Sequence, residues 1–170
     1  MQRQHRFTEC SAALRYRYRD GRVPVPAERA ASGQYARDRD TLLAVSSAAP
    51  QRVAAGLDAF DFRAATGAIW DVVEAANRYV EQTEPWRLAR AERDGDPAAG
   101  ERLDEVLALL VSTCARIGRL LAPFLPGLAA KIQTACDDSA GELPPAQPVF
   151  PRLELPIPAV PAGALLHDLG

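Results

Sequence analysis

An apolar stripe in the middle of the chain constrains the fold more than any other feature of the sequence. Its six members recur at spacings of 3, 4, 3, 4 and 3 residues, which is the period of one face of an α-helix. The stripe therefore predicts a continuous helix over residues 61–84, with Asp61 as its N-cap. The members of the stripe are Phe62, Ala65, Ile69, Val72, Ala76 and Tyr79.

Further helices are expected on both sides of this one, because similar apolar patterns recur along the chain. Pro50 lies inside one of them and should either kink it or mark a new start. Pro123 and Pro126 should restart the last helix. The expected helices are residues 5–18, 39–60, 86–93, 100–121 and about 126–137, with a polar loop at 27–37 and another loop at 94–97.

These patterns predict an all-α fold. Outside the C-terminal segment no series of strands can be found, and an antiparallel bundle of four or five helices is the natural way to bury the stripes. We expect the bundle to occupy residues 1–138 and a proline-rich, extended arm and tail to occupy 139–170. Residues expected to face inward include Leu42, Leu43, Val53 and Leu57 from one helix, and Leu103, Val106, Leu107, Leu110, Cys114, Ile117 and Leu121 from another.

The cysteines and histidines do not point to a metal site or a disulfide framework. Cys10, Cys114 and Cys136 are odd in number and lack CxxC spacing, which is typical of reduced thiols in a cytosolic protein. His5 and His167 lie near opposite ends, so no zinc site is predicted. The N-terminal residues lack the apolar run of a signal peptide, and no uninterrupted apolar segment is long enough to span a membrane. We expect a cytoplasmic protein without metal or cofactor.

The motifs of the common catalytic classes are absent. The sequence has no GxxxxGK[ST] loop, no GxGxxG turn after a strand and no GxSxG elbow. Glu74, Glu81 and Glu84 share the 61–84 helix but lie on its outer face, where solvated surface is the simpler interpretation. The sequence therefore predicts a binding module and not an enzyme.

Charge is distributed unevenly along the chain. Residues 1–39 hold nine arginines and four carboxylates, a net charge of +5, and the remaining residues carry −7. A basic segment on an acidic body suits either a polyanionic partner or a solvated helix face.

Several motifs, in order along the chain, resemble the anticodon-binding domain of methionyl-tRNA synthetases. The central one runs from Asn77-Arg78-Tyr79 to Pro85-Trp86 and Leu88-Ala89-Arg90, similar to the family's Asn-x-Tyr and Pro-Trp-x-Leu-Ala-Lys pattern, with arginine in place of the last lysine. The other segments with family resemblance are Arg17–Pro24, Leu120–Pro126 and Phe150–Glu154.

The resemblance implies that Trp86 stacks on an anticodon base. From position alone, Trp86 either staples two helices in the core or projects from the helix end that Pro85 creates. The family favours the second interpretation, with an exposed or half-exposed indole as a platform for a nucleobase. Trp70, in mid-helix, is expected to pack. The implied RNA-binding set on this side is Pro85, Trp86, Arg87, Arg90 and Asn77, and Asn77 and Tyr79 are also implied to fix the corner by hydrogen bonds.

Two departures from the family pattern limit what can be transferred. The class I signatures for ATP and the family's zinc-bearing insertion are missing, so we expect a free-standing domain that cannot activate methionine. The family's anticodon-reading asparagine and arginine fall, without gaps, on Arg6 and Cys10, and neither matches. We therefore expect impaired anticodon specificity, with nonspecific phosphate contacts from Arg6, Arg15 and Arg19.

Two functions stay open at this stage. The chain is either a tRNA-binding module that assists a separate catalytic domain, or a protein-interaction module that docks on a synthetase-like catalytic partner. An exposed apolar patch would favour docking, whereas a surface of Trp86 and arginines without such a patch would favour RNA binding.

Overall fold

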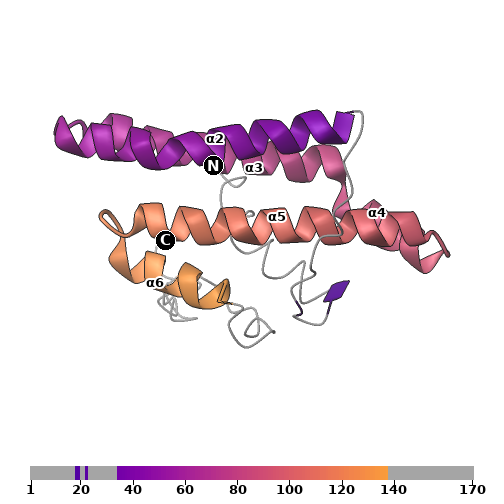
Figure 1. Cartoon of the computed structure of the whole chain (residues 1–170). Helices are drawn as coiled ribbons and strands as arrows, with labels where there is room; N and C mark the ends of the chain where they lie inside the picture. The colour runs from indigo at the N-terminus through magenta and orange to yellow at the C-terminus, as the bar shows by residue number, and fades with distance from the viewer. Residues whose placement is uncertain (1–17, 20–21, 23–33, 138–170) are drawn as a thin grey trace, which may run out of the picture.

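Five α-helices make up the regular structure in the part of the chain that the computed structural model describes, residues 18–19, 22 and 34–137 (Figure 1). The predicted all-α class is confirmed. The predicted helix at 5–18, apart from Tyr18, and the arm at 139–170 lie outside the described residues. The helices are α2 (Gln34–Asp58), α3 (Phe62–Thr83), α4 (Pro85–Arg93), α5 (Pro97–Leu121) and α6 (Pro126–Ala135).

The helices form a layered bundle. A short connection joins α2 to α3, and the two lie side by side as an antiparallel hairpin along the upper edge of Figure 1. The long helix α5 packs against both of them, and α6 folds back along α5. The short α4 packs on α5, so the α3–α4 corner stands at one end of the bundle.

Aspartate caps define where α3 and α5 begin. Asp61 accepts a hydrogen bond from the backbone N–H of Ala64 (2.9 Å), as expected for an N-cap. Asp96 does the same for Ala98 and Ala99, with Pro97 in the first helical position, where its missing N–H costs nothing. This cap starts α5 three residues before the predicted position.

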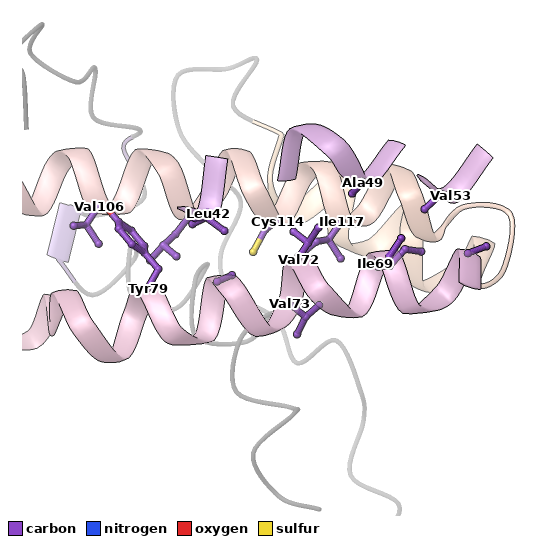
Figure 2. Packing of buried hydrophobic residues seen from close by; sticks show 14 residues of the cluster. Leu42, Ala49, Val53, Ile69, Val72, Val73, Tyr79, Val106, Cys114 and Ile117 are labelled. Carbon is purple, nitrogen blue, oxygen red and sulfur yellow. The ribbon is translucent and has the colours of Figure 1, made fainter. Parts of the chain in front are cut away.

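The core lies where α2, α3 and α5 meet (Figure 2). Ile69 and Val72 of α3 point toward Ile117 of α5, and Tyr79 lies close to Val106. The stripe that predicted α3 is buried except for its first member, Phe62. Fully buried side chains include Leu42, Val72, Leu103, Val106, Leu107, Leu110, Cys114 and Ile117.

Pro50 does not begin a new helix, because α2 runs through it. A proline inside a helix leaves the carbonyl four residues earlier without its usual N–H partner. Here that carbonyl belongs to Ser46, and the guanidinium of Arg116 on α5 donates to it (3.1 Å). A tertiary hydrogen bond thus satisfies the orphaned acceptor and lets α2 continue.

Two smaller expectations about α2 are wrong. Residues 34–37 belong to the helix and not to a polar loop. Leu43 is exposed, because it lies about 100° around the helix from buried Leu42 and none of the helices in residues 34–137 covers it.

Candidate nucleic-acid interface

The corner between α3 and α4 is built around Glu84. This residue has φ +43° and ψ +60°, a left-handed conformation that residues other than glycine rarely adopt. Its backbone N–H donates to the Val80 carbonyl (3.1 Å) and ends α3, and its own carbonyl accepts from Arg87 (2.7 Å) and starts α4. The Thr83 hydroxyl also donates to the Tyr79 carbonyl (2.7 Å). One residue thus serves as the cap of both helices, so the chain turns sharply.

Pro85 and Trp86 follow this turn and differ in burial. Pro85 is fully buried and occupies the first position of α4. The indole of Trp86 is 46% exposed, which matches the expected half-exposed aromatic and excludes a fully buried staple. A buried proline therefore fixes the base of the corner, while the ring beside it keeps one part open to solvent.

Two arginines lie on the surface of α4 close to Trp86 in sequence. Arg87 is exposed and pairs with Glu84 (2.8 Å), and exposed Arg90 lies 3.9 Å from a carboxylate oxygen of Asp94. Exposed ion pairs of this kind contribute about 0–1 kcal/mol, so a phosphate can displace the carboxylate at little cost. The acidic neighbours also keep the local net charge small.

Asn77 and Tyr79 lie on α3, one to two turns before the corner. Asn77 is half-buried and Tyr79 is buried. In the part of the chain that the structure describes, the corner's hydrogen bonds come from Thr83 and the backbone of Glu84, and no side-chain hydrogen bond of Asn77 is seen. Packing therefore explains Tyr79 better than the implied hydrogen bond does, and a contact of Asn77 with RNA stays a prediction.

Burial gives Tyr79 a measurable pH dependence. Burial, with a smaller contribution from Glu105, raises the pKa of the Tyr79 phenol from 10.0 to about 12. The unfolded chain loses this proton first, so its contribution to stability is complete below pH 10 and is lost as the pH rises toward 12. We expect the free energy of unfolding to fall by about 2 kcal/mol over that range relative to Tyr79→Phe. Urea titrations of both proteins at each pH check this, and parallel profiles would contradict it.

Arg19 lies against the α4–α5 hairpin and forms ion pairs with Glu92 of α4 and Asp104 of α5. Its side chain is only 21% exposed. Burial lowers the pKa of the guanidinium, but hydrogen bonds and charges from Glu92 and Asp104 outweigh that effect and raise the pKa above its ordinary value. Arg6, Cys10 and Arg15 lie outside the described residues, so the predicted phosphate contacts from Arg6 and Arg15 stay predictions.

A second exposed feature on α3 was missed by the sequence analysis. Trp70 is 51% exposed, so the expectation that it packs in the core is wrong. Phe62 is 57% exposed on the same helix, and Phe60, just before it, is 82% exposed. Trp70 directly follows buried Ile69, so it lies at the edge of the apolar face of α3, where no described helix covers it. We call Phe60, Phe62 and Trp70 the α3 aromatic patch.

The described residues contain no group of three or more His, Cys, Asp or Glu side chains arranged to hold a metal ion. Cys114 is buried and Cys136 is half-buried, and neither forms a disulfide. None of the helices in residues 34–137 is both long and apolar enough to cross a membrane.

Solved structures define the class of this bundle. The crystal structure of Mycobacterium tuberculosis methionyl-tRNA synthetase bound by methionyl-adenylate superposes with a TM-score of 0.75 at 25% identity, over 88% of this chain and 31% of that one. The apo form of the same synthetase gives 0.76 at 26% identity, over 91% of this chain and 32% of that one. The fold is therefore that of a helical domain found within an aminoacyl-tRNA synthetase. No protein-family model matches the chain.

Curated relatives lead to the family. Methionine–tRNA ligase of Brucella suis is 32% identical over 149 residues, which is 78% of this chain and 26% of that protein. Methionine–tRNA ligase of Caldanaerobacter subterraneus is 35% identical over 68% of this chain and 16% of its own length. Methionine–tRNA ligase 1 of Bacillus cereus is 27% identical over 69% of this chain and 20% of its own length. The chain belongs with the methionyl-tRNA synthetases and spans about a quarter or less of the length of these relatives. The resemblance seen in the sequence motifs is confirmed.

Proposed function

We propose that the chain is a tRNA-binding module that contacts the anticodon loop through the α3–α4 corner. The observation that carries the proposal is the half-exposed indole of Trp86, set on buried Pro85. Single-stranded loops of RNA offer unstacked bases, and proteins bind them by stacking aromatic rings on the bases. A relationship to enzymes named for their action on tRNA makes the anticodon loop the first candidate.

The charges at the corner suit a nonspecific grip on the backbone. Exposed Arg87 and Arg90 can each exchange a weakly held carboxylate for a phosphate. We also assign Asn77 to the RNA-binding residues of this corner, as a secondary contact. The chain has neither anticodon-reading side chain of the family at positions 6 and 10, so we expect little discrimination between anticodons.

This function is not catalytic. The sequence lacks the ATP signatures of class I synthetases, and it spans only a part of the related enzymes. We propose that it does not aminoacylate tRNA by itself and acts in the cytoplasm beside a separate catalytic domain, without a cofactor or metal of its own.

A titration with labelled tRNA at two salt concentrations tests the proposal. Two phosphate contacts to single-stranded RNA give a slope of about −1.4 in log K against log salt, so a fourfold rise in salt should weaken binding about sevenfold. A tRNA with another anticodon should bind with similar affinity. Absence of any binding at the lower salt concentration would overturn the proposal.

The α3 aromatic patch favours a second candidate function, docking on a protein. Three large aromatic side chains are exposed between the end of α2 and the middle of α3, and exposed apolar surface of this kind marks binding sites where it is contiguous. Because the chain covers only 31–32% of the solved synthetases, the occupant we propose is a synthetase-like catalytic domain. Helix α3 has 22 residues and is about 33 Å long, so Phe62 and Trp86 mark opposite ends. The two functions are therefore compatible.

Mixing the chain with the catalytic part of a methionyl-tRNA synthetase tests docking. Phe62→Ser with Trp70→Ser should weaken a complex seen by analytical ultracentrifugation, while Trp86→Ala should leave it intact. A complex that survives the double change, or no complex at all, would eliminate this patch as the docking surface.

A further inference from the structure

All five N–H donors of the Arg19 guanidinium are used within the protein. Its Nε donates to Asp104 (2.5 Å), and its two terminal nitrogens donate to both carboxylate oxygens of Glu92 (2.9 and 3.0 Å). The remaining two donors go to the backbone carbonyls of Tyr18 (2.9 Å) and Gly100 (3.2 Å). An arginine side chain has five such donors, so none is left for an RNA phosphate unless this network breaks.

The surroundings of Arg19 fit the network closely. Tyr18 packs against the small apolar cluster of Ala89, Leu103 and Leu107, which joins α4 to α5. At Gly100, an added Cβ would lie 2.6 Å from a carboxylate oxygen of Glu92, so a larger residue would force that carboxylate to shift from the position in which Arg19 binds it.

Helix α4 needs such an anchor because it is short and contributes little to the core. It has nine residues, of which only Pro85 and Ala89 are buried. Helices of this length are marginal without tertiary contacts. Glu92, which Arg19 holds, and Trp86 are six residues apart on α4, about 9 Å along its axis. Because so short a helix moves as one piece, a link at its C-terminal end adds to the hold that buried Pro85 has on the end that carries Trp86.

We infer that Arg19 is a positioning residue that clamps α4 to α5 and so holds the Trp86 indole in place, and that it is not a phosphate contact. The inference rests on the proposed function of Trp86. It replaces the role that the sequence suggested for Arg19.

Fluorescence measures the position of Trp86 without RNA. In a Trp70→Phe background, Trp86 is the remaining tryptophan, and Arg19→Gln should raise its acrylamide quenching constant by about twofold while far-UV circular dichroism stays unchanged. Arg52→Gln is the matched control, since it removes an arginine that pairs with Asp71 between α2 and α3 (2.7 Å), away from α4. Arg52→Gln should leave the quenching unchanged. Equal quenching in Arg19→Gln and the parent would overturn the inference.

Removing an acidic partner gives opposite outcomes for the two roles of Arg19. If Arg19 contacts phosphate, Asp104→Asn releases its Nε donor and removes a competing negative charge, so tRNA binding becomes tighter with a steeper salt dependence. If Arg19 positions Trp86, Asp104→Asn loosens α4, and binding weakens about threefold to tenfold with the salt slope unchanged. Tighter binding would overturn the inference.

The quenching and tRNA-binding experiments together distinguish a failure of this inference from a failure of the proposed function. If the parent protein binds no tRNA but Trp86 is still released by Arg19→Gln, the clamp exists and only the RNA-binding proposal fails. If tRNA binds and the quenching does not respond, Trp86 is positioned by other contacts and the inference fails alone.

Discussion

Replacing Trp86 by alanine is expected to weaken tRNA binding by about 5-fold to 150-fold, the equivalent of about 1–3 kcal/mol for one stacked base. The ring lies half-exposed at the first turn of α4, so its loss removes a stacking surface without opening the core. Fluorescence anisotropy with labelled tRNA at low salt measures the change. The salt slope should stay the same, because no phosphate contact is removed.

Trp70→Ala is the matched control for this experiment. It makes the same chemical change at a tryptophan of similar exposure on α3, away from the α3–α4 corner. We expect tRNA binding by Trp70→Ala to equal that of the parent. Equal losses in both variants would indicate nonspecific adhesion to exposed indoles, and no loss in Trp86→Ala would remove stacking at the corner from the proposed function.

Replacing Gly56 by valine is expected to lower the free energy of unfolding by about 3 kcal/mol, the upper end of the usual cost of overpacking, because the close contact is with backbone atoms. Gly56 is buried near the end of α2, where a Cβ would lie 2.7 Å from the backbone nitrogen of Ala65 and 2.9 Å from its Cβ. Backbone atoms cannot move aside as a flexible side chain does. The valine must therefore push α2 and α3 apart, and these two helices share the most extensive interface among the described helices.

Gly67→Val on α3 is the control, because an added Cβ there meets nothing within 4 Å. Valine and glycine differ by only about 0.5 kcal/mol in helix propensity, so this change should be nearly neutral. Urea denaturation followed by circular dichroism measures both variants. Similar stabilities would mean that α2 and α3 do not approach each other as closely as the structure has them.

The sequence predicted the helices well where their signals are local. The apolar period placed α3 to within a residue at each end, and the cap at Asp61 was identified because a carboxylate before an apolar stripe satisfies free backbone N–H groups. The break at Pro85 was also local, since a proline restricts the residue before it. The structure resolved the remaining choice at this corner by leaving Trp86 half-exposed.

Pro50 and Trp70 show where local signals fail. Pro50 was expected either to kink its helix or to mark a new start. The new start is wrong, because the Ser46 carbonyl that the proline orphans is satisfied by Arg116, 70 positions away in sequence. Trp70 was expected to be buried because it sits beside Ile69. The width of the buried face of a helix depends on which neighbouring helices cover it. No described helix covers the edge of the α3 face on which Trp70 lies.

By itself, the sequence determined that this chain forms helices, where most of them begin and end, and that it is related to methionyl-tRNA synthetases, because period, caps and family motifs are carried by residues close together in the chain. Only the tertiary structure decided which aromatic rings face solvent and which groups Arg19 pairs with. Its carboxylate partners, Glu92 and Asp104, lie 73 and 85 positions away. Whether an arginine meets a phosphate or a carboxylate depends on the packing of distant helices, which no local pattern records.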